Sequence, residues 1–200
     1  MYYIPLMRKA VMLLLTLFAA SAFALEPMTM TDERGAMHRL FASDATATVI
    51  LVQGNGCPIV RSVLPRFREV RDAYRARGVE FLLANANPQD DATSVQREAD
   101  EFRFDIPVLL DREQGLADVL DIVRTAEVFV IEPTRHEVVY RGPIDDRMSY
   151  GREKATAGAH YLRDALDAVL SGGTIEVAER SAPGCLIRRE HRSGVTKGVD

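Results

Sequence analysis

The stretch Thr48-Val49-Ile50-Leu51-Val52-Gln53-Gly54-Asn55-Gly56-Cys57-Pro58 decides the fold of this chain. Its first six residues form a continuous, largely β-branched run, which is typical of a strand buried on both faces of a parallel sheet. A glycine-flanked turn follows and leads into a helical pattern. Pro58 suits the first turn of a helix, where no N–H donor is needed. The segment therefore predicts a strand, a turn and a helix, with Cys57 at the helix N-terminus.

The chain after Cys57 continues to alternate between helix and strand patterns. Apolar residues at mostly three- and four-residue steps predict a helix from Val60 to Tyr74, kinked at Pro65 and closed by Gly78. Strands are predicted over 79–85, 106–111, 128–131 and 138–141, and helices after a capping box at Thr93 and Gln96, over 114–120 and over 161–169. This order predicts an α/β fold: a central mixed sheet with helices on both faces and an antiparallel hairpin at one side.

The two ends of the chain differ from this central part. Arg8 and Lys9, the apolar run 10–20 and the small residues Ala22 and Ala24 predict a cleaved secretory signal peptide over residues 1–24. A membrane anchor is the alternative, but the run is shorter than the roughly 20 residues that span a bilayer. Residues 25–173 are then one domain, with a short helix around 35–42. Residues 174–200 form a C-terminal tail, partly disordered. We expect a periplasmic protein with no stable membrane insertion after signal removal.

The charge balance argues against nucleic acid as a partner. The chain has 25 Lys and Arg against 29 Asp and Glu, a formal charge of −4, which becomes about −6 without residues 1–24. Binding to phosphates would need a basic face. The four histidines are scattered and have no metal-site spacing, so neither a metal nor an organic cofactor is expected: His38, His136, His160 and His191.

Cys57 is the residue most suited to chemistry. It lies at the carboxyl end of a predicted strand, where ligand sites of α/β sheets concentrate. Free backbone N–H groups and the positive end of the helix dipole stabilise a thiolate there. A thiol whose pKa is lowered in this way is reactive and easily oxidised.

Several segments, in this order, resemble the thioredoxin-like superfamily and, within it, the redoxin or peroxiredoxin-like (AhpC/TSA-type) branch: 54–58, Pro65, 104–111, 127–131 and 140–146. The resemblance extends over roughly residues 45–170. It implies a redox role for Cys57 as nucleophile, with an exported thiol or disulfide protein or a peroxide as partner. Residues expected to bind substrate are Gly54, Asn55, Gly56, Pro58 and Thr125. Arg124, just before a late strand, is either a thiolate stabiliser or a solvated helix-end arginine.

The chain also departs from the motifs of this superfamily. The second cysteine of a Cys-x-x-Cys pair is replaced by Val60, and the usual cis-proline position holds Ala126. The proline and hydroxyl positions of the peroxiredoxin motif Pro-x-x-x-Thr/Ser-x-x-Cys hold Ile50 and Gly54. Neither ordinary thioredoxin-type reduction nor efficient peroxidase activity is therefore expected.

Cys185, in the tail, has three interpretations that the sequence leaves open. It is a resolving thiol for Cys57, a structural disulfide partner, or a cysteine that is unpaired or pairs with another molecule. Two functions follow: an exported thiol-dependent oxidoreductase or peroxidase-like redoxin, and a non-catalytic thioredoxin-fold binding module of the cell envelope. An exposed, acidic Cys57 favours the first function, and a buried thiol of ordinary pKa favours the second.

Overall fold

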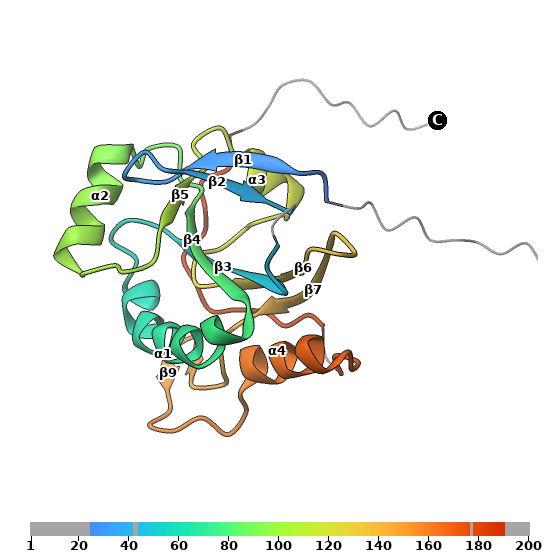
Figure 1. The fold of residues 1–200 in the computed structure, drawn as a ribbon. Helices are drawn as coiled ribbons and strands as arrows, with labels where there is room; N and C mark the ends of the chain where they lie inside the picture. The colour runs from blue at the N-terminus through green and yellow to red at the C-terminus, as the bar shows by residue number, and fades with distance from the viewer. Residues whose placement is uncertain (1–24, 42–43, 177, 191–200) are drawn as a thin grey trace, which may run out of the picture.

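A five-stranded mixed sheet forms the centre of the protein (Figure 1). The computed structural model describes residues 25–41, 44–176 and 178–190. The strand order is β5-β4-β3-β6-β7. The three neighbouring strands β5, β4 and β3 are parallel, whereas β6 runs antiparallel to both β3 and β7. The bounds are β3 Ala47–Gln53, β4 Val79–Asn85, β5 Val108–Leu110, β6 Val128–Glu132 and β7 Glu137–Gly142. The predicted mixed sheet is confirmed.

Each face of the sheet is covered by a separate apolar core. Val49 and Leu51 of β3 face helices α1 (Pro58–Tyr74), α2 (Ala92–Glu101) and α4 (Tyr161–Ser171). Ile50 and Val52 point the opposite way, as strand periodicity requires. They pack with helix α3 (Gly115–Val119) and the hairpin of β1 (Met28–Thr31) and β2 (Met37–Leu40). Helices therefore lie on both faces, as predicted.

The helix predicted around residues 35–42 is wrong, because this region contributes to the β1–β2 hairpin. Asp32 Oδ1 accepts the backbone N–H groups of Arg34 and Ala36, each at 2.9 Å, and so closes the turn. Gly35 adopts φ +87°, a left-handed conformation that glycine tolerates best. The hairpin packs the buried side chains of Met30 and Leu40 onto the sheet, so tertiary burial outweighs local helix propensity.

The predicted capping box at Thr93 and Gln96 is also wrong. Helix α2 begins one residue after Asp91, whose side chain accepts the N–H of Ser94 at 2.8 Å. Asp caps a helix start as well as Ser or Thr does, and Asp91 precedes Thr93 in the chain, so the helix begins at the earlier cap. Helix α1 ends as predicted near Gly78, through a short 3-10 turn, Arg75–Arg77. The segment between β7 and α4 contains a small hairpin, β8 (Met148–Ser149) and β9 (Arg152–Glu153).

The chain after α4 returns to the sheet edge and then to the end of β3. Arg141 N–H donates to Ala178 O at 2.8 Å, and Arg180 N–H donates to Arg141 O at 2.9 Å. Further on, Ile187 N–H donates to Val123 O at 2.9 Å, and its side chain joins the second core. The predicted signal peptide and the last ten residues lie outside the described residues. Within the described part of the chain, every helix is too short or too polar to cross a membrane.

Candidate functional site

Cys57 lies at the junction of β3 and α1, as the sequence predicts. It is the residue before the first helical residue, Pro58, and its own N–H donates to Gly54 O at 3.1 Å. Gly56 makes the turn with φ +74°, and a Cβ there would meet nothing within 4 Å. Gly54 has no such freedom, because a Cβ would lie 2.6 Å from Asn87 Nδ2. The turn thus presents an open Gly56 and a tightly enclosed Gly54 next to the thiol.

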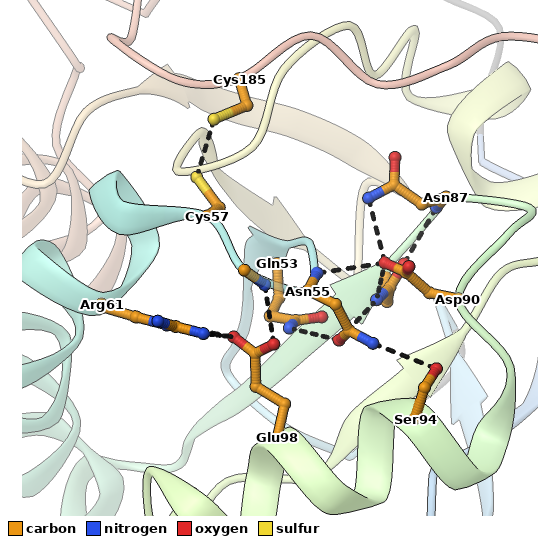
Figure 2. Close-up of polar contacts among 11 residues, drawn as sticks. Gln53, Asn55, Cys57, Arg61, Asn87, Asp90, Ser94, Glu98 and Cys185 are labelled. Atoms are coloured by element: carbon orange, nitrogen blue, oxygen red, sulfur yellow. Dashed lines mark hydrogen bonds and ion pairs between the residues drawn. The ribbon is translucent and has the colours of Figure 1, made fainter.

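The tail brings a second thiol to this point. Cys185 Sγ lies 3.2 Å from Cys57 Sγ, although the two residues are 128 positions apart (Figure 2). A disulfide bond is about 2.05 Å long, so the structure contains two free thiols in contact. Their exposure differs: Cys57 is buried, whereas Cys185 is exposed. This geometry brings Cys185 within contact of Cys57, as both the resolving-thiol and the structural-disulfide interpretations require.

Thr125 holds the two cysteines together from the loop before β6. Its Oγ1 lies 3.0 Å from Cys57 Sγ and accepts the backbone N–H of Cys185 at 2.9 Å. Its own N–H donates to Cys185 O, also at 2.9 Å. Gly184 fits against this loop only because it lacks a side chain, since a Cβ would lie 1.7 Å from Thr125 O. The Cys185 segment is therefore hydrogen-bonded to Thr125 through its backbone.

The surroundings shift the pKa values of the two thiols in opposite directions. Burial raises the pKa of Cys57, but hydrogen bonds from the Thr125 hydroxyl, the Val60 N–H and Cys185 outweigh it, so this pKa lies below its ordinary value. Burial raises the pKa of Cys185, and the neighbouring Cys57 raises it further. When one proton leaves the pair, it therefore leaves Cys57.

Arg124 lies beside the Cys185 segment. Its Nη1 donates to Gly184 O at 3.3 Å, and its guanidinium lies 5.8 Å from the ring centroid of Tyr150. The Tyr150 hydroxyl donates to the same carbonyl at 3.3 Å. Among the described contacts of Arg124, none reaches the Cys57 sulfur. The guanidinium therefore lies against the backbone next to Cys185.

A buried polar network behind the Cys57 turn was missed by the sequence analysis (Figure 2). Asp90 Oδ2 accepts three donors: Asn55 N at 3.0 Å, Asn85 Nδ2 at 2.9 Å and Asn87 Nδ2 at 3.2 Å. The Asn55 side chain in turn donates to Ser94 Oγ at 3.1 Å. These bonds fix the backbone of Asn55 against the end of β4.

Glu98 of α2 completes this support from the other side. Its Oε2 accepts the N–H of Gly56 at 2.7 Å, and its Oε1 lies 3.3 Å from Arg61 Nη2. Arg61 also lies over the Phe102 ring at 3.9 Å from its centroid. Asn55 was expected to bind substrate, whereas no role was predicted for Asp90 or Glu98. The pairing of β3 with β4 would have revealed this network. The two strands are parallel and end at the same level, with Gln53 opposite Asn85, so the polar residues after each strand lie side by side.

No group of three or more His, Cys, Asp and Glu side chains in the described residues is arranged to hold a metal ion. The chemistry available at this site is that of two thiols, one hydroxyl and the backbone N–H groups around them.

Comparisons with known proteins identify the family and the fold of this chain. The sequence profile of the AhpC/TSA family matches residues 19–143. The thiol-disulfide oxidoreductase ResA of Geobacillus kaustophilus (strain HTA426) is 24% identical over 103 residues, which cover 52% of this chain and 58% of ResA. The chain thus spans less than two thirds of the length of this curated relative.

Solved structures give the same fold. An uncharacterized conserved protein from Geobacillus kaustophilus superposes with a TM-score of 0.70 at 29% identity, covering 84% of this chain and 90% of its own. A hypothetical protein from Sinorhizobium meliloti 1021 also gives 0.70, at 24% identity, covering 82% and 91%. StoA from Bacillus subtilis gives 0.51 at 18% identity, covering 58% and 86%. The thioredoxin-like fold is therefore shown.

Proposed function

Because the chain belongs to the AhpC/TSA family of thioredoxin-like redoxins, we propose that it is an exported thiol–disulfide oxidoreductase whose redox pair is Cys57 and Cys185. The observation that carries the proposal is the 3.2 Å separation of the two sulfurs. A disulfide between them requires the sulfurs to approach by only about 1 Å. The pair takes the place of the Cys-x-x-Cys dithiol that this sequence lacks at Val60.

The reaction is an exchange of two electrons and two protons between dithiol and disulfide. In one direction, the Cys57 and Cys185 thiols become a disulfide while a partner disulfide becomes two thiols. In the other direction, a partner dithiol is oxidised and the Cys57–Cys185 disulfide is reduced. Such exchange proceeds by attack of a thiolate on a disulfide sulfur, so the lowered pKa of Cys57 supplies the anion at lower pH than an ordinary thiol would.

Disulfide exchange is favoured over peroxide reduction by the hydrogen bonds of Thr125. A threonine hydroxyl has one hydrogen to donate. At 3.0 Å from Cys57 Sγ, that hydrogen is used on the thiolate, while the oxygen accepts the N–H of Cys185. Gly54 supplies no hydroxyl in its place. Among the described contacts of Cys57, no second hydroxyl is therefore free to orient a peroxide, and peroxide turnover is expected to be slow.

Export is supported by the sequence of residues 1–24, with a basic start, a short apolar run and an Ala-x-Ala exit. We place the protein in the periplasm, where structural and redox disulfides persist. Cell fractionation with an antibody or tag at the C-terminus tests this. A periplasmic product shortened by about 24 residues supports export, and a full-length cytoplasmic product contradicts it.

The redox proposal is tested by equilibrium with glutathione. The protein purified from cells is incubated over a series of reduced-to-oxidised glutathione ratios, quenched in acid, alkylated and analysed by mass spectrometry. The oxidoreductase is supported if the Cys57–Cys185 disulfide forms reversibly and its reduced, dithiol form reduces an added disulfide substrate. Cys57→Ser and Cys185→Ser are the matched controls, and each must abolish it. If no intramolecular disulfide forms at any ratio, the oxidoreductase is refuted and the non-catalytic binding module takes its place.

A further inference from the structure

The two sulfurs of the proposed redox pair differ in access. Cys57 is 4% exposed and is enclosed by Thr125, Cys185 and the first turn of α1. Cys185 is exposed, and its neighbour Leu186 has 67% of its surface open to solvent. In Figure 2 the Cys185 side chain extends from the tail segment toward the Cys57 sulfur. Bringing the sulfurs together by about 1 Å leaves Cys185 as the outer one.

The backbone around Cys185 holds this arrangement in place. Two hydrogen bonds of 2.9 Å, from Thr125 N–H to Cys185 O and from Cys185 N–H to Thr125 Oγ1, fix residue 185 against the loop. The 2.9 Å bond from Ile187 N–H to Val123 O fixes the chain two residues later. An incoming molecule therefore meets Cys185 first, with Cys57 beneath it. This is the reverse of a site in which the helix-N-terminal cysteine is the outer one.

We propose, on the basis of the function above, that external thiols react with this protein at the sulfur of Cys185 and that Cys57 is the internal thiolate. In the oxidised protein, a thiolate R–S⁻ attacks Cys185 Sγ. A bond forms between R–S and Cys185, the Cys57–Cys185 bond breaks, and its electron pair leaves on Cys57. A second thiol of the same reductant then attacks the reductant's first sulfur in the mixed disulfide. The reductant becomes an internal disulfide, and Cys185 leaves as a thiolate, which takes up a proton.

The hydrogen bonds of the site suit this order of steps. Exchange is faster when the leaving sulfur is a stable anion, and the Thr125 hydroxyl and the Val60 N–H are already directed at Cys57. The reverse reaction follows the same path: Cys185 attacks a partner disulfide, and Cys57 then attacks Cys185 to expel the partner as a thiol. Cys57 never needs to reach the surface in either direction.

The test follows glutathione, a monothiol that cannot complete the second step. The oxidised protein is mixed with reduced glutathione in the presence of iodoacetamide, which alkylates whichever protein thiol is released. The two cysteines lie on different tryptic peptides, residues 40–61 and 181–188. The expected product carries glutathione on 181–188 and the alkyl group on 40–61. Glutathione on 40–61 with alkylated 181–188 would overturn the proposal.

Matched single-cysteine proteins give a second readout that does not depend on the pair. Cys57→Ser and Cys185→Ser are each loaded with a thionitrobenzoate group on the remaining cysteine, and release of the coloured leaving group by glutathione is timed. Because the leaving group is the same, the rates compare access alone, and we expect Cys185 to react roughly tenfold faster or more. Equal rates, or a faster Cys57, contradict the proposal. Failure of wild-type protein to form the disulfide at all would instead refute the function proposed above.

Discussion

Thr125→Val removes one hydroxyl and keeps the shape of the side chain. In the wild type that hydroxyl lies 3.0 Å from Cys57 Sγ, and residue 125 is 1% exposed, so water cannot easily replace it. A hydrogen bond to a charged group contributes about 1.5–3 kcal/mol. Losing it should therefore lower the thiolate fraction of Cys57 at a fixed pH below its pKa by roughly 10- to 100-fold. The pKa of Cys57 rises toward, or beyond, that of an ordinary thiol.

The assay is the pH dependence of iodoacetamide labelling, read separately on peptides 40–61 and 181–188 by mass spectrometry. Thr125→Ser is the control, because it keeps the hydroxyl and removes only a methyl group. The expected result is an inflection for Cys57 that moves up in Thr125→Val and stays near the wild-type value in Thr125→Ser. An unchanged inflection in Thr125→Val would refute the argument that this hydroxyl stabilises the thiolate. Equal shifts in both variants would assign the effect to packing instead.

Three further predictions concern the surroundings of the site. Gly184→Ala should displace the tail and slow Cys57–Cys185 disulfide formation, because a Cβ would lie 1.7 Å from Thr125 O; Gly115→Ala, with contacts no closer than 3.9 Å, should form the disulfide normally. Asp90→Ala removes the acceptor of three hydrogen bonds and should lower the free energy of unfolding in urea by about 3 kcal/mol or more. Asp90→Asn keeps one carbonyl acceptor, so its free energy of unfolding should fall by less than half as much as that of Asp90→Ala. Equal losses in the two variants would exclude the hydrogen bonds to Asp90 as the cause. In Cys185→Ser protein, the Thr125 hydroxyl and the Val60 N–H still lower the pKa of Cys57. The lowered pKa stabilises the fold above the unfolded pKa of about 8.5, and this contribution is lost as the pH falls through the folded pKa. The difference in urea midpoint between Cys185→Ser and the double variant that also carries Cys57→Ser should shrink as the pH falls. A difference that grows toward low pH would contradict the prediction.

The sequence predicts those parts of the fold whose signals are local. The run over residues 48–53 appears as β3, and the helix from Val60 to Tyr74 appears within α1. In both cases the spacing of apolar residues within the segment itself matches the side chains that are buried in the structure. The position of Cys57 follows from these two elements alone, because it directly precedes the first residue of the helix that β3 leads into.

The rest depends on contacts between distant segments. The approach of Cys185 to Cys57 requires the tail to cross the sheet edge and return through Thr125, and no periodicity in residues 178–187 encodes that path. The network around Asp90 was equally hidden, because a polar residue in a loop reads as solvated until the neighbouring strand is placed beside it. Local pattern also misassigned residues 37–40, where burial of Leu40 decides for a strand.

Burial and acidity of Cys57 were expected to occur as alternatives, one favouring a binding module and the other an enzyme. The protein combines them: Cys57 is 4% exposed, and its pKa is nevertheless lowered. The combination has a physical cause, since the groups that enclose the sulfur are themselves donors, namely the Thr125 hydroxyl, the Val60 N–H and Cys185. An inert buried thiol would be enclosed by apolar atoms, which raise the pKa without compensation. A buried thiolate with its own exposed relay sulfur at 3.2 Å needs no access of its own, so burial does not count against redox chemistry at this site.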